Sequence, residues 1–167
     1  EALPGTPIDR KAYNDLVLDP DGVIRRNLLH VGGQDPSKIS LPLRLVSIST
    51  RNSNMDELIE SGEISAPWLS PGSGGYQNID AGGYQKLLFF REPNSFNNFN
   101  LSKLLNNKVP IEYLNNKIVL IGSTAPSLKD LFEVPHTRFN SGKSQYLMPG
   151  VEVHAHRVSR SEEHTSE

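Results

Sequence analysis

The run Lys117-Ile-Val-Leu-Ile-Gly122 decides the fold class, because it is an uninterrupted apolar stretch that ends in glycine. Such β-branched runs are typical of strands whose two faces are both covered in an α/β sheet. We therefore predict an α/β fold in which residues 117–122 form a buried central strand flanked by helices. The sheet is expected to be incomplete on its N-terminal side.

Two apolar segments nearer the N-terminus are also predicted to be strands. Val23–Val31 follows the turn Asp19-Pro-Asp-Gly22, in which proline presets φ and glycine accepts a positive φ. Tyr84–Arg91 follows a stretch at 63–83 that is rich in glycine, serine and proline and is predicted to be a long loop.

Three segments have the pattern of helices. Residues 41–61 carry apolar side chains at helical spacings and end before Gly62. Residues 101–105 predict a short helix that Asn100 or Ser102 could cap. The last segment, 151–158, is expected to be a helix entered through Pro149-Gly150.

The composition fits one globular unit and excludes several classes of protein. The chain has 167 residues, 36% of them hydrophobic, and a formal charge of −2 without a long basic stretch, so no nucleic-acid partner is expected. It has no cysteine, which excludes disulfides, thiolate metal sites and cysteine nucleophiles. No stretch approaches the roughly 20 apolar residues that cross a bilayer.

The two ends are predicted to lie outside the folded unit. Residues 1–9 have the composition of a loop, and the first residue is glutamate rather than an initiator methionine, so we expect an upstream part of the protein to be missing. Residues 160–167 break from the preceding apolar pattern and resemble a translated sequencing adapter. We predict that this tail is not native, which places the domain at 10–159.

The motifs that could carry catalysis or bind a cofactor are incomplete. After Gly122 a phosphate-binding loop would need Gly-Lys at 127–128, where serine and leucine stand, and no dinucleotide fingerprint follows the strand. The acidic turn at 19–21 lacks the further oxygen ligands of a calcium loop. We therefore expect no catalytic residues, no metal and no cofactor.

Two histidines near the C-terminus could form a metal-ligand pair. On a helix, however, His154 and His156 point about 200° apart, which favours one buried and one exposed histidine over chelation. A catalytic group of Asp130, Glu133 and His136 is also less favoured than a surface loop, because nothing in the sequence makes these three residues converge.

Five segments taken together resemble the bacterial extracellular sensing domains called CHASE, type two. The order and spacing of the segments match the family as well as their residues do. They are Asp19–Arg26, Gly83–Arg91, Lys117–Ala125, Lys129–Phe132 and Met148–Ala155.

The resemblance implies an α/β sensor domain on the extracytoplasmic face of the bacterial cell membrane. It implies membrane helices on both sides of the domain, a cytoplasmic cyclase, kinase or caspase-like protease as output, and a possible dimer in the full receptor. It also implies that the chain is the C-terminal two-thirds of such a domain. It supplies neither the small-molecule or environmental ligand nor the residues that bind it.

Ligands of open α/β sheets bind in the loops after the carboxyl ends of the strands. We therefore predict a binding site for a polar or anionic ligand in the loops that follow the two last strands. Its candidate residues are Arg91, Gly122, Ser123, Thr124, Lys129 and Asp130. The alternative is a soluble Rossmann-like, nucleotide-binding enzyme fragment built on the strand at 117–122.

Overall fold

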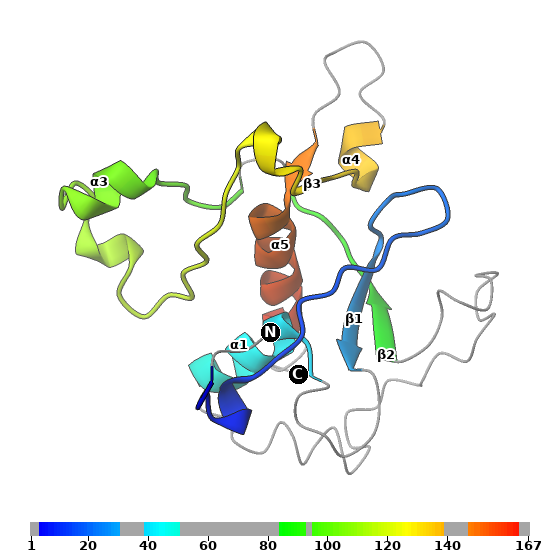
Figure 1. Ribbon diagram of the computed structural model, residues 1–167, viewed down its shortest axis with the longest axis horizontal. Helices are drawn as coiled ribbons and strands as arrows, with labels where there is room; N and C mark the ends of the chain where they lie inside the picture. The colour runs from blue at the N-terminus through cyan, green and yellow to red at the C-terminus, as the bar shows by residue number, and fades with distance from the viewer. Residues whose placement is uncertain (1–3, 31–38, 51–83, 93–94, 139–146, 164–167) are drawn as a thin grey trace.

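The computed structural model describes residues 4–30, 39–50, 84–92, 95–138 and 147–163. The helix α5 (Gly150–Glu163) lies at the centre of the ribbon, with strands on one side of it and an extended arm on the other (Figure 1). The helix begins at Gly150 immediately after Pro149, as predicted from the sequence. None of the described helices is long and apolar enough to cross a membrane.

The main pair of strands is β1 (Arg26–His30) and β2 (Tyr84–Leu87), which run antiparallel. Arg26 faces Leu87 and the register shifts after Leu28. The predicted turn before β1 is confirmed, because the Gly22 N–H donates to the Asp19 carbonyl at 2.8 Å and Gly22 has φ +81°. Both predicted strands therefore exist, but each is shorter than its apolar segment.

A second, smaller pair covers the beginning of α5. It consists of β3 (Leu131–Phe132) and β4 (Met148–Pro149), which are antiparallel, and α4 (Pro135–Arg138) follows β3. A parallel bridge joins Val23 to Glu133, and the Ile24 N–H donates to the Glu133 carbonyl at 2.9 Å. The two strand pairs are thereby linked through the chain that enters β1.

The core forms where these elements meet one face of α5. Its members are buried apolar side chains from the chain that enters β1, the chain that follows β2, the β3–α4 connection, β4 and α5, with Leu16 and Phe132 packed against them. They are Ile24, Leu88, Phe90, Val134, Met148 and Val153. Their removal from water is the main favourable contribution to this packing.

The remaining helices differ in how far they are buried. Helix α1 (Leu41–Thr50) packs against α5 and is the part of the predicted 41–61 helix that the described residues contain. Helix α3 (Leu101–Leu105) is capped by Asn100, whose side chain accepts from the Lys103 N–H at 3.0 Å. The short 3-10 helices are η1 (Ile8–Arg10), η4 (Ile111–Tyr113) and η5 (Pro126–Leu128).

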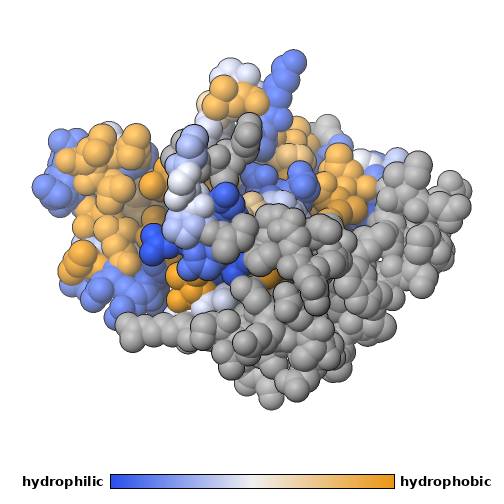
Figure 2. Space-filling model, turned by 60° about the horizontal axis from the view of Figure 1, so that its bottom comes forward, coloured by the Kyte–Doolittle hydropathy of each residue, from blue (hydrophilic) through white to orange (hydrophobic). Residues whose placement is uncertain are grey.

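The arm that carries α3 and η4 exposes much of its apolar surface. Leu101, Leu105 and Ile111 are all more than half exposed. Figure 2 shows hydrophobic residues gathered over this arm, on the left of the view. These exposed apolar side chains therefore lie away from the core.

The prediction of a buried central strand at Lys117–Gly122 is not confirmed. These residues form an irregular segment, Val119 is 49% exposed and Ile121 is 80% exposed, whereas Ile118 and Leu120 are half-buried. Among the described residues, no backbone hydrogen bond pairs this segment with a strand. The apolar run is covered on one side rather than two, so the pattern alone overstated its burial.

The coarser prediction of a mixed α/β fold stands, because helices pack with small antiparallel pairs of strands. The predicted loop at 63–83 and the second half of the 41–61 helix lie outside the described residues. Residues 160–163 continue α5, and the Arg160 Nε donates to the Phe89 carbonyl at 2.9 Å. That the tail at 160–167 is not native stays a prediction.

The exposure of Val119 gives a direct test of this arrangement. We expect Val119→Asp to change the free energy of unfolding by less than about 1 kcal/mol, because the new carboxylate can remain in water. If residue 119 lay in a strand covered on both faces, the same change would lower the free energy of unfolding by about 3 kcal/mol or more. Chemical unfolding of the two proteins measures the difference, and a loss in the larger range would contradict the structure.

Candidate functional site

Two of the predicted binding residues lie at the first turn of α5. A Cβ atom placed on Gly122 would be 2.6 Å from the Val151 Cβ, so this approach requires glycine. The Gly150 N–H donates to the Asp130 carbonyl at 3.0 Å, and a Cβ on Gly150 would be only 2.5 Å from the Asp130 carboxylate. That carboxylate therefore lies beside the N-terminus of α5, where a negative charge is favourable.

The residues between these two form the turn that joins them. The Ser123 Oγ accepts from the Ala125 N–H at 3.2 Å, and Thr124 is exposed. Lys129 follows η5 with φ 55° in the left-handed region, and its side chain is exposed. Ser123 thus stabilises the turn locally, whereas Thr124 and Lys129 present their side chains to solvent.

Arg91 contacts α5 further along the helix than Gly122 and Asp130 do. It follows β2, and its backbone N–H donates to the His156 Nδ1 at 3.3 Å, while its side chain is exposed. His156 lies five residues beyond Val151, which is about 7.5 Å further along a helix axis. The structure therefore brings Gly122 and Asp130 together at the start of α5 and places Arg91 near its middle. Ligand binding by these residues stays a prediction.

A buried arginine on α5 is the most important residue that the sequence pattern did not identify. Arg157 is 1% exposed, and its Nε donates to the Asn27 Oδ1 of β1 at 2.7 Å. Its Nη2 donates to the Leu28 carbonyl at 3.2 Å. Burial lowers the pKa of the guanidinium to about 10, because its charge is removed from water.

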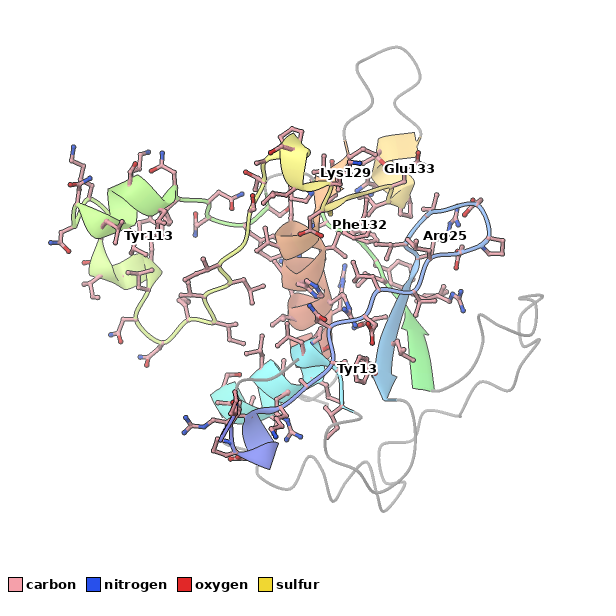
Figure 3. The ribbon with its side chains drawn as sticks, in the orientation of Figure 1. Tyr13, Arg25, Tyr113, Lys129, Phe132 and Glu133 are labelled. Atoms are coloured by element: carbon pink, nitrogen blue, oxygen red, sulfur yellow. The ribbon has the colours of Figure 1, made fainter. Side chains whose placement is uncertain are left out.

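Tyr13 lies close to this guanidinium. Its side chain projects between α5 and β1 (Figure 3), and its hydroxyl is buried without a hydrogen-bond partner among the described residues. Burial raises the pKa of the phenol, and the positive charge of Arg157 opposes that rise. A polar group of Tyr13, Asn27 and Arg157 therefore lies inside the interface between the helix and the strand.

The two histidines of α5 are both held in the neutral form. His156 is 1% exposed, as expected for one of the pair, but His154 is half-buried rather than exposed. Burial lowers the pKa of each to about 4. The His154 Nδ1 is 3.2 Å from the Arg157 Nη1, so this nitrogen must be the acceptor.

The acidic turn before β1 has an electrostatic role. The buried Asp19 carboxylate is 2.8 Å from the Arg26 Nε and 2.8 Å from Nη1 of Arg25 (Figure 3). Arg25 also makes a two-point contact with Asp21, and hydrogen bonds with Asp21 and Asp19 raise its pKa. Arginines therefore occupy the carboxylates that a cation would need. No cluster of three or more potential metal ligands occurs among the described residues.

A model of the CHASE2 domain family matches residues 3–162, which is most of the chain. The chain belongs to the CHASE2 family. Comparison with curated proteins and with solved structures finds no significant match. The resemblance seen in the sequence is thereby confirmed, and the matched range includes the first three residues of the predicted tail.

CHASE2 domains are extracellular or periplasmic sensor domains of bacterial signalling receptors. This places the chain among signal-transduction proteins. The alternative interpretation as a Rossmann-like enzyme has no support, since the segment at 117–122 that it required is not a strand in the structure.

The contact of Gly122 with α5 can be tested by adding a single methyl group. We expect Gly122→Ala to lower the free energy of unfolding by about 1–3 kcal/mol, because its Cβ would overlap Val151. The nearby exposed change Thr124→Ala is the matched control and should stay within about 0.5 kcal/mol. Equal stability of Gly122→Ala and the parent would show that the two segments are not in contact.

Proposed function

We propose that this CHASE2 domain is the non-catalytic signal-input unit of a bacterial membrane receptor and lies on the extracytoplasmic face of the membrane. The observation that supports this most strongly is the family match over residues 3–162. In the proposed receptor, membrane helices outside this chain connect the domain to a cytoplasmic cyclase, kinase or caspase-like protease.

The arrangement around α5 suggests how a signal could leave the domain. The turn at Gly122, the carboxylate of Asp130 and the amide of Arg91 all contact this one helix. A ligand that moved the loops after 91 or 122 would therefore change the packing of α5 directly. We propose that the helix transmits this displacement toward the membrane, as small shifts of packed helices do in other switching proteins.

The ligand in this proposal is polar or anionic. The exposed side chains of Arg91, Thr124 and Lys129 offer positive charge and a hydroxyl group, and Gly122 and Ser123 belong to the same loop. Asp130 is assigned the positioning of α5 rather than direct recognition of an anion, because its carboxylate lies beside the first residue of the helix.

The location of the domain can be tested by labelling a single introduced cysteine, because the chain has no natural one. In the receptor freed of its other cysteines, the exposed Lys108→Cys should react with a membrane-impermeant maleimide in intact cells. The buried Val153→Cys is the matched control and should react only after denaturation. Labelling of Lys108→Cys only after lysis would contradict an extracytoplasmic location.

The signalling role of the loops can be tested in the same receptor. We expect Arg91→Ala and Thr124→Ala each to shift the dose response to the stimulus by about tenfold or more. A shift of this size corresponds to the loss of roughly one hydrogen bond between a charged group and the ligand. Arg91→Ala keeps the backbone N–H that binds His156, so a shift reports on the side chain. Lys108→Ala, which removes an exposed charge from the arm, should leave the response unchanged. An unaltered response of both loop variants would place ligand recognition elsewhere.

A further inference from the structure

His156 lies where α5 meets the chain that follows β2. Its ring is almost completely buried, and its Nδ1 accepts the hydrogen bond from the Arg91 N–H. The ring packs edge-on against Phe90 and Phe96, with centroid distances of 5.1 and 4.8 Å. One imidazole therefore joins the helix to both sides of the segment after β2.

The hydrogen bond from Arg91 fixes the protonation of this imidazole. A backbone N–H can only donate, so the His156 Nδ1 must be unprotonated and the proton of the neutral ring lies on Nε2. The Nε2 is buried and has no hydrogen-bond partner among the described residues. This arrangement disfavours a metal at Nε2, because metal binding would move the proton to Nδ1 and direct it at the Arg91 N–H.

The surrounding charges also oppose protonation. His136 of α4, Arg91 after β2 and Arg160 of α5 all act on His156 with positive or potentially positive charge. The Nδ1 of His136 is likewise buried without a partner among the described residues. A second proton on His156 would therefore place a cation in an apolar site among other cations, with one N–H facing another.

We propose that His156 is an acid-sensitive contact, whose protonation breaks the hydrogen bond from Arg91 and releases the segment after β2 from α5. Release satisfies both ring nitrogens, because the imidazolium can then reach water. This property belongs to the domain itself and does not depend on the function proposed above.

The direction of the pH dependence follows from the two states of the contact. Burial and the neighbouring charges lower the pKa of His156 from 6.5 to about 4 in the closed state. The open state binds the proton between these pH values and the closed state does not, so opening becomes more favourable as the pH falls from 6.5 to 4. Below pH 4 both states bind the proton and the dependence levels off.

Amide hydrogen exchange of the Arg91 N–H measures this opening in the 167-residue chain. We expect the opening constant, corrected for intrinsic exchange, to rise roughly 100-fold between pH 6.5 and 4. The core amide of Ile24, which donates to Glu133, is the internal reference for unfolding of the whole domain. A rise for Arg91 that exceeds that of Ile24 indicates local release, whereas identical rises would overturn the proposal.

Substitution separates His156 from the other acid-sensitive groups. His156→Asn places an amide oxygen near the position of Nδ1, so it can still accept from Arg91 but cannot take up a proton at these pH values. We expect the rise of its Arg91 opening constant between pH 6.5 and 4 to match the rise for Ile24 within about threefold. His154→Asn, on the same helix, is the matched control and should keep the response of the parent.

The titration of His156 in the parent chain provides a test that does not require the variants to fold. Ring-proton NMR should give a pKa for His156 below 5. A value near 6.5 would overturn the proposal, as would an unchanged acid response in folded His156→Asn.

Discussion

The hydrogen bond between the Arg157 guanidinium and the Asn27 side chain is the interaction on which the arrangement of helix and strands depends. It joins α5 to β1 at 2.7 Å, in a place where neither side chain has access to water. A buried guanidinium is costly unless its N–H groups find acceptors, and here neutral acceptors on β1 supply them. Any rearrangement that separated α5 from β1 would leave this charge without them, so the helix has one preferred position against the strand.

The other contacts of α5 are consistent with that position. Gly122 and Asp130 meet its first turn, where only glycine allows the approach and where a carboxylate favours the helix N-terminus. Arg91 meets it at His156. A helix that is held at its start by one loop and near its middle by two other segments can respond to movement in any of them. This is the property that the proposed signalling role requires of α5.

The sequence predicted local features better than long-range ones. The turn at Asp19–Gly22, the Asn100 cap and the start of α5 at Gly150 are confirmed, because each depends on residues close together in the chain. Burial of 117–122 was not predicted correctly, since an apolar run does not reveal which segment covers it. The polar contact between Arg157 and Asn27 joins residues 130 positions apart, and no spacing rule indicates such a pair.

The same distinction between local and long-range features applies to the candidate site. The sequence predicted a ligand site in the loops after 91 and 122, and ligand binding there stays a prediction. The structure connects Gly122, Asp130 and Arg91 of these loops to α5. The sequence could not identify the neutral state of His156, because that state is produced by burial and by charges on three separate segments. Helical spacing predicted that only one of the two histidines would be buried, but not what that histidine would contact.

The most direct test of this account is a double-mutant cycle on Asn27 and Arg157. Asn27→Ala removes an acceptor from a buried guanidinium, Arg157→Met removes the charge, and the combined variant removes both. The account predicts that Asn27→Ala costs about 1–3 kcal/mol in the parent and much less beside Arg157→Met, with a coupling energy of at least about 1 kcal/mol. Additive losses, with a coupling energy near zero, would contradict the claim that this contact holds α5 on β1.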